Sequence, residues 1–185
     1  MARWSGWGSK SYKGALAVAT ALVLAACAAM EEPPGPQPVS GRIQVLAGLN
    51  PNAEGRPSPV TIRLYQLRDR EAFLNASLQE LVMQDTDTLG VALLSRDSFE
   101  LCPVEMGTTE ASAGGVLCQG EEQAVVQVFS PEARYLAVMA EFFDVRDPAA
   151  QWRTVAALPQ GGVEERNEAT FTITLDGVRV AVQID

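Results

Sequence analysis

The chain has 185 residues, of which 47% are hydrophobic, with 23 acidic and 14 basic side chains, a formal net charge of -9 and no histidine. A chain this acidic is not expected to bind nucleic acid, because that binding depends on Lys and Arg neutralising phosphates. Without histidine the common serine and cysteine triads cannot form, so we expect neither an enzyme nor a cofactor.

Residues 1–26 have the pattern of a bacterial signal peptide. Three basic residues precede an uncharged run over residues 15–26. Twelve residues are too few for a transmembrane helix, which needs about 20, so export followed by cleavage is the better interpretation. Removal of this segment takes away three basic residues and no acidic one, which changes the net charge from -9 to -12.

Cys27 ends the motif Leu24-Ala25-Ala26-Cys27, which fits the bacterial lipobox. The thiol is therefore predicted to carry diacylglycerol, with fatty acyl chains such as palmitate holding the mature protein on a membrane. A buried cysteine in an ordinary hydrophobic segment is the alternative.

Residues 27–40 are predicted to form the lipidated cysteine and a tether. Four prolines and two glutamates give this segment a composition that favours extended polyproline structure and cannot pack a core. The domain is then expected over residues 41–185.

Apolar and polar residues alternate over 42–49 and again over 60–65, as in strands with one buried face. Between them lies a loop with three prolines and one glycine, which we predict to be stiff and exposed. The loop consists of Asn50, Pro51, Asn52, Ala53, Glu54, Gly55, Arg56, Pro57, Ser58 and Pro59.

Residues 69–84 change to helical periodicity, with Asp69 as a candidate cap, and predict one or two short helices. The apolar residues 89–94 continue the segment in a conformation that periodicity does not decide. We expect the helices to pack on the sheet.

Strand patterns return from Ser98 to the C-terminus. They include Phe99 and Leu101, then Ala124, Val126 and Val128; residues 135–143 are apolar on both faces, apart from Glu141, which predicts a central strand. Residues 152–157 fit an edge strand, and Asp176-Gly177 is predicted to turn a final hairpin. Seven or eight short strands predict a mainly β protein, a two-sheet β-sandwich with a helical insertion after the second strand.

Cys102 and Cys118 form an even pair once Cys27 carries lipid, and they are predicted to be bridged by a disulfide. Two free thiols are the alternative. No metal site is expected, because two sulfurs without histidine fall short of the four ligands of zinc. Glu141 and Asp144 are the one candidate carboxylate pair, but strand geometry sends them to opposite faces.

The sequence resembles the TssJ (SciN) family, the outer-membrane lipoproteins of the type VI secretion system. The resemblance rests on Leu49 to Asn52, Gly55 to Pro57, Pro59-Val60, Arg63 to Leu67, Phe73, Ala76, Leu81, Leu89-Gly90, Leu136 to Val138, Phe142 to Arg146 and Trp152-Arg153. Cys102 and Cys118 are not part of this pattern.

The resemblance implies a transthyretin-like β-sandwich on the periplasmic face of the outer membrane. It also implies a structural role in a TssJ-TssL-TssM complex, in which the loop over residues 50–59 contacts the periplasmic C-terminal region of TssM, an inner-membrane protein. The alternative is a periplasmic carbohydrate- or peptide-binding lipoprotein with a platform of Tyr65, Tyr135 and Trp152.

Overall fold

The computed structural model describes residues 35–103, 122–160 and 169–185, which lie within one compact unit over residues 34–185. The expected signal peptide, Cys27 and Cys118 lie outside the described residues. Within the described ranges, no helix has both the length and the apolar character needed to cross a membrane.

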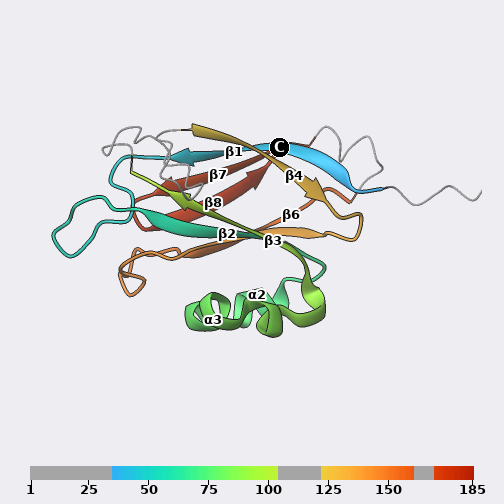
Figure 1. The fold of residues 1–185 in the computed structure, drawn as a ribbon, viewed down its shortest axis with the longest axis horizontal. Helices are drawn as coiled ribbons and strands as arrows, with labels where there is room; N and C mark the ends of the chain where they lie inside the picture. The colour runs from blue at the N-terminus through green and yellow to red at the C-terminus, as the bar shows by residue number, and fades with distance from the viewer. Residues whose placement is uncertain (1–34, 104–121, 161–168) are drawn as a thin grey trace, which may run out of the picture. The chain divides into compact units, whose positions relative to one another are not determined.

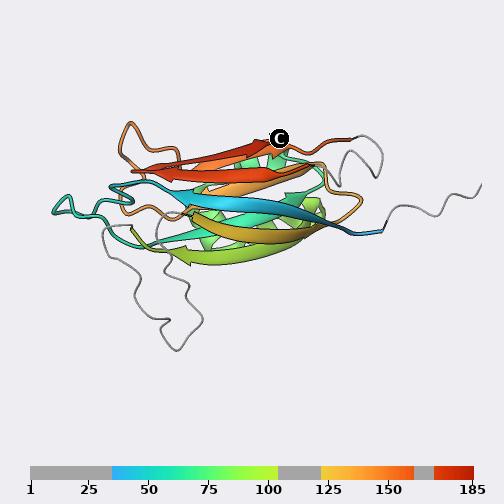
Figure 2. The ribbon, with the colours of Figure 1, turned by 90° about the horizontal axis from the view of Figure 1, so that it is seen from above.

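Two four-stranded sheets face each other (Figures 1 and 2). The first has the order β4-β1-β7-β8 and the second β3-β2-β5-β6. The strands are β1 (Gln37–Val45), β2 (Val60–Leu67), β3 (Leu93–Leu101), β4 (Glu122–Phe129), β5 (Tyr135–Ala140), β6 (Arg153–Ala157), β7 (Phe171–Asp176) and β8 (Arg179–Ile184). All described strand pairs are antiparallel except β1 with β7. The predicted sandwich is confirmed.

The core between the sheets follows the period-two alternation of the strands. In β7, Phe171, Ile173 and Leu175 are fully buried and the threonines between them are half-buried. Strand β5 is buried on both faces, because one face packs in the core between the sheets and the other packs under the helices. The predicted central strand is confirmed, but it ends at Ala140 and not at residue 143. Strand β6 is the predicted edge strand.

Strand β1 begins at Gln37, inside the segment predicted as tether, and ends at Val45. Val39 is buried, and Pro38 is paired in register with Val128 of β4. Gly41 is required here, because a Cβ at this position would lie 2.3 Å from the ring of Phe171. The close approach of two strands thus explains a glycine in a strand interior.

The inward face of β4 differs from the expected one. Val126 and Val128 are 64% and 58% exposed, whereas Val125, Gln127 and Phe129 are buried. The register explains this, because Gly41 pairs with Val125 and Val39 with Gln127, and residues directly opposite share a face. The final turn also lies one residue later than the predicted Asp176-Gly177: Asp176 pairs with Arg179, so Gly177 and Val178 form the turn.

The helical insertion comprises α2 (Glu71–Asn75), α3 (Leu78–Leu89) and a 3-10 turn, η2 (Gly90–Ala92), and it covers the outer face of the second sheet (Figure 1). Ser77 and Glu80 start α3 with a reciprocal capping box. A second apolar cluster, which includes Tyr65, Phe73 and Leu81, fills the space between helices and sheet. The helical segment ends five residues later than the predicted residue 84.

A kink at Gln84 interrupts α3, and the side chain of Arg63 of β2 binds backbone carbonyl oxygens beside the kink. Gln84 has non-helical φ and ψ of -152° and 40°. The Arg63 guanidinium donates to the carbonyl oxygens of Leu81 and Val82, at 2.9 and 3.2 Å. Backbone acceptors near the break in the helix therefore keep hydrogen bonds.

Asp85, directly after the kink, is the centre of a buried ionic cluster. Its carboxylate accepts hydrogen bonds from Arg96 at 2.6 and 2.8 Å, from Arg63 at 3.2 Å and from the Tyr65 hydroxyl at 3.1 Å. Burial alone raises the pKa of Asp85, but the hydrogen bonds from Arg96 and Tyr65, together with the charge of Arg96, outweigh burial and leave this pKa below its ordinary value. Arg63 also pairs with Glu141 at 2.8 Å.

A second arginine of the same sheet holds α2. Arg153 of β6 donates to the carbonyl oxygens of Phe73 and Ala76, at 2.9 and 2.6 Å. Its guanidinium also lies 4.6 Å from the ring centre of Trp152. Both helices are thus attached to the sheet by arginines that satisfy backbone carbonyls as well as by apolar packing.

We predict that Asp85→Asn lowers the free energy of unfolding by about 2 kcal/mol at pH 7, because the buried carboxylate loses its charge-assisted hydrogen bonds to Arg96 and Arg63. Because the folded-state pKa of Asp85 lies below its unfolded value of 3.8, the carboxylate stabilises the fold above that pH and less as pH falls below it. Denaturant titrations of both proteins between pH 2 and 7 measure this difference, which should narrow under acid. A difference that stays constant over this range contradicts the assignment.

Candidate functional site

The loop over residues 50–59 extends from one end of the sandwich (Figures 1 and 2). It connects β1 to β2, which belong to different sheets. Ala53, Glu54, Gly55 and Arg56 at its tip are exposed, and Pro51 and Pro57 are half-buried. The predicted exposure of the tip is confirmed.

The tip is ordered by its own hydrogen bonds. The side-chain oxygen of Asn52 accepts from the backbone N–H groups of Glu54 and Arg56, both at 3.0 Å. The Asn52 N–H donates to the Arg56 carbonyl oxygen at 2.9 Å, and Gly55 takes the left-handed φ of +73° that the turn needs. The tip is therefore already ordered before binding, so less conformational entropy is lost when a partner binds it.

Asn50 holds the base of the loop. It is only 4% exposed and has a φ of +48°. Its side-chain nitrogen donates to the Pro59 carbonyl oxygen at 2.5 Å, and its side-chain oxygen accepts from the Phe143 N–H at 2.7 Å. The Asn50 N–H donates to the carbonyl oxygen of Gly177 at 2.8 Å. One residue thus joins the two ends of the loop to two other segments.

The segment over residues 141–152, between β5 and β6, lies at the same end of the sandwich. The Gln151 N–H donates to the Val178 carbonyl oxygen at 3.0 Å, and the Val180 N–H donates to the Gln151 carbonyl oxygen at 2.9 Å. The Arg179 side chain donates to the Ala149 carbonyl oxygen at 3.2 Å. The loop 50–59, the segment 141–152 and the β7–β8 turn therefore form one connected surface, which we call the loop end.

The structure changes the role of one residue in the predicted loop. Asn50 is buried, so it organises the loop and is not itself available for contact. Sequence reasoning missed this role and also missed Phe143, which is 64% exposed. An asparagine at the start of a loop was a usable signal, because asparagine tolerates positive φ.

The predicted disulfide is described on one side only. Cys102 is 2% exposed and disulfide-bonded. Its pairing with Cys118 stays a prediction, because Cys118 lies outside the described residues.

The three aromatic residues of the alternative binding platform do not form one exposed patch. Tyr65 is fully buried. Tyr135 and Trp152 are partly buried against the helix-side apolar cluster, and the guanidinium groups of Arg70 and Arg153 lie near their rings. No stacking surface for a sugar is built from these residues.

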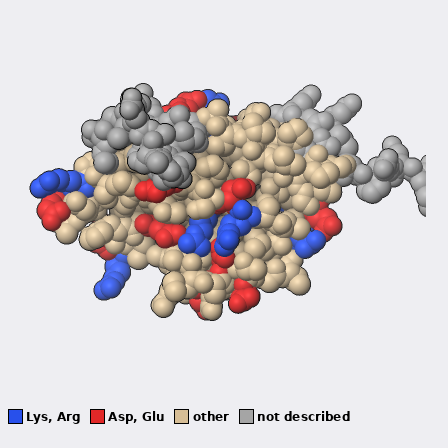
Figure 3. All heavy atoms as spheres, in the orientation of Figure 1, with Lys and Arg blue, Asp and Glu red and all other residues tan. Residues whose placement is uncertain are grey.

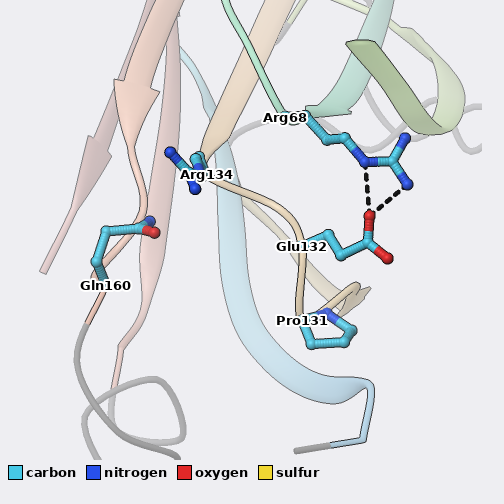
Figure 4. Close-up of a pocket in the computed structure, with 5 residues that line it drawn as sticks. All are labelled: Arg68, Pro131, Glu132, Arg134 and Gln160. Atoms are coloured by element: carbon cyan, nitrogen blue, oxygen red, sulfur yellow. Dashed lines mark hydrogen bonds and ion pairs between the residues drawn. The ribbon is translucent and has the colours of Figure 1, made fainter. Parts of the chain in front are cut away.

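A shallow pocket of about 430 Å³ lies at the opposite end of the sandwich, lined by Arg68, Pro131, Glu132, Arg134 and Gln160 (Figure 4). The Arg68 Nε donates to Glu132 at 2.6 Å, so these two charges satisfy each other. The single carboxylate that lines the pocket is thus already paired, and the lining holds no second carboxylate with which it could act as an acid–base pair.

The two candidate carboxylates follow β5, which ends at Ala140, so strand alternation does not place them, and they have different partners. Glu141 pairs with Arg63, and Asp144 accepts a hydrogen bond from the backbone N–H of Arg146 at 3.0 Å. Within the three described ranges, no three His, Cys, Asp or Glu side chains gather as a metal site would need. The face drawn in Figure 3 carries charges of both signs side by side.

We predict that Asn50→Gly lowers the free energy of unfolding by about 2 kcal/mol, because glycine keeps the positive φ but loses two side-chain hydrogen bonds. Hydrogen exchange at the Phe143 amide should accelerate in this variant. Asn50→Asp is the matched control, since its side chain still accepts from that amide. Equal protection of the amide in Asn50→Gly and in the unaltered chain would show that the contact is not formed.

Comparison with known proteins agrees with this architecture. The model of the family described as "Type VI secretion lipoprotein, VasD, EvfM, TssJ" matches residues 37–114. No curated protein matches the chain.

Several solved structures share the fold. The lipoprotein TssJ1 of the Pseudomonas aeruginosa type VI secretion system is 26% identical, with a TM-score of 0.64 over 81% of this chain and 97% of that one. Lip of Serratia marcescens, a membrane-bound component of the type VI secretion system, is 22% identical, with a TM-score of 0.60 over 79% and 96%. A chain in the structure described as "T6SS protein TssM C-terminal domain (869-1107) from EAEC" is 20% identical, with a TM-score of 0.57 over 80% and 98%.

The family model covers the first three strands, the loop and the helical insertion, and the TssJ1 structure extends the similarity over both sheets. The resemblance drawn from the sequence is confirmed. This chain is thus similar to the TssJ (SciN) family of type VI secretion lipoproteins, in sequence over residues 37–114 and in fold over most of its length.

Proposed function

We propose that this protein is a structural, non-enzymatic component of the type VI secretion membrane complex, anchored by lipid to the periplasmic face of the outer membrane. Its loop over residues 50–59 binds the periplasmic C-terminal region of a TssM-like inner-membrane protein, within a complex that also contains a TssL-like protein. The observation that carries the proposal is the braced, exposed loop in a chain that the model of the TssJ family matches.

The order of the tip supports a binding role. Two backbone N–H groups already point at the Asn52 side chain, and Asn50 closes the base. A partner that contacts Glu54 and Arg56 therefore meets a nearly fixed backbone, and less of the interaction energy is lost in ordering the loop.

The proposed partner is inferred from the family match and from a solved structure that contains a chain of the same fold. A chain of this fold occurs in the structure described as the TssM C-terminal domain from EAEC. That likeness concerns the fold alone, and the match to the model of the type VI secretion lipoprotein family supplies the link to the same secretion system.

The geometry of β1 supports an orientation in which the loop end points away from the lipid. Nine residues separate Cys27 from Gln37, where β1 begins, and an extended polyproline chain of that length would span about 28 Å. Strand β1 then covers nine residues, about 30 Å, before the chain reaches the loop end. An anchor at Cys27 would thus attach to one end of the domain and leave the other end free.

We predict that the full-length chain, purified in detergent, binds the soluble periplasmic region of TssM in a calorimetric titration. Replacing residues 53–57 by a Gly-Ser segment of equal length should weaken binding about a hundredfold, because it removes the ordered tip but keeps Asn50. Arg56→Glu should weaken binding about tenfold through the loss of its charge at the contact.

Arg134→Glu is the matched control for Arg56→Glu. Arg134 is exposed and lies at the opposite end of the sandwich, in the pocket of Figure 4. The affinity of Arg134→Glu for the periplasmic region of TssM should stay within twofold of that of the unaltered chain. Absence of any binding heat for the unaltered chain, with a folded partner, would refute the proposed partnership.

We predict that Cys27 carries the lipid anchor. Growth with labelled palmitate should label the chain, and Cys27→Ser should abolish the label and release the protein from the outer-membrane fraction, because acyl chains supply the membrane affinity. Cys102→Ser is the control and should keep the label. Labelled Cys27→Ser protein would disprove the assigned anchor.

A further inference from the structure

Phe143 is an exposed aromatic side chain that belongs to neither apolar cluster of the domain. It is 64% exposed, whereas the preceding Phe142 is 4% exposed and belongs to the core between the sheets. Within the described part of the chain, the other large hydrophobic side chains that are exposed are all aliphatic, and only Phe143 is aromatic. A ring in water contributes little to folding, so its exposure points to a contact outside the domain.

The backbone that carries Phe143 is fixed. Its N–H donates to the buried side chain of Asn50 at 2.7 Å. The following residues form capped turns: Asp144 accepts from the Arg146 N–H at 3.0 Å, and Asp147 accepts from the Ala149 N–H at 2.7 Å. The ring is therefore presented from an ordered segment, as the anchors of protein interfaces are.

Phe143 also shares its support with the predicted binding loop. The same Asn50 side chain binds the Phe143 N–H and the Pro59 carbonyl oxygen, so the two segments keep one relative position. Leu46, which is 46% exposed, precedes the loop and donates its N–H to the Leu175 carbonyl oxygen at 2.8 Å. Exposed apolar side chains thus lie in the segment 141–152 of the loop end and just before the loop 50–59.

Other exposed apolar side chains lie on separate elements. Met83 and Val91 belong to α3 and η2 on the outer side of the second sheet, and Val126 and Val128 belong to β4. In the described part of the chain, none of these four residues is hydrogen-bonded to the loop 50–59, whereas Phe143 is. Continuity with the loop therefore singles out Phe143.

We propose that Phe143 is a second anchor of the partner-binding surface, and that its ring enters an apolar pocket on the periplasmic region of the TssM-like partner. This inference rests on the proposed function. The loop 50–59 supplies polar and charged contacts through Glu54 and Arg56, and Phe143 supplies the buried aromatic contact. Interfaces concentrate their energy in such aromatic anchors, with polar groups around them.

The test measures the affinity of full-length Phe143→Ser for the soluble periplasmic region of TssM by calorimetry. We expect the dissociation constant to rise at least tenfold, and Phe143→Leu to recover most of the loss because it keeps apolar volume. Met83→Ser is the matched control, since Met83 is 75% exposed on α3 and its removal should change affinity less than twofold. Thermal unfolding of all variants checks that the fold is retained, as expected for substitutions of exposed side chains.

The outcomes separate this inference from the proposed function. If replacement of residues 53–57 removes binding but Phe143→Ser stays within twofold of the unaltered chain, the second anchor is overturned and the partnership stands. If Met83→Ser weakens binding as much as Phe143→Ser, the effect is a general one of exposed apolar area and the anchor is likewise overturned. If the unaltered chain does not bind, both the proposed function and this inference fail.

Discussion

The buried side-chain amide of Asn50 is the contact on which the loop end depends. It satisfies the Pro59 carbonyl and the Phe143 N–H, two backbone groups that no regular sheet pairing serves. A buried polar group without a partner costs about 1 to 3 kcal/mol, so each of these bonds matters to where the loop lies. The residue must also take a φ of +48°, which glycine and asparagine tolerate best. Only asparagine combines that backbone with a donor and an acceptor.

On the other side of the second sheet, two arginines have a comparable role for the helices. Arg63 and Arg153 reach from β2 and β6 to backbone carbonyls of α3 and α2. Arginine suits this position because one planar group offers five donors and stays charged. Arg63 also pairs with Glu141, which follows β5 and begins the segment that carries Phe143. The helical insertion and the loop end are therefore connected through one guanidinium.

The sequence predicted the sandwich because alternation has a single physical cause, a buried face on each strand. The prediction from alternation failed where a segment could bury either of its two faces. In β4 both alternating sets contain apolar residues, so only the pairing of Gly41 with Val125 decides which set faces inward. Strand β1 extends into proline-rich sequence because Val39 finds a place in the core. Of the loop end, the exposed tip was predictable, but the contact between Asn50 and Phe143 joins residues 93 positions apart, and no local pattern records it.

In the proposed role, β1 is also the path between the anchor and the binding loop. The tether enters at Gln37 and the loop end begins after Val45, so a pull between the two membranes would act along this strand. Strand β1 lies inside its sheet, paired with β4 on one side and β7 on the other. Hydrogen bonds of an antiparallel pair run perpendicular to the strands, so a force along β1 would load many of them together. Beyond the strand, Asn50 passes the load to Gly177 and Phe143 as well as to the loop. A strand that is hydrogen-bonded to a neighbour on both sides suits a protein whose proposed task is to hold a partner.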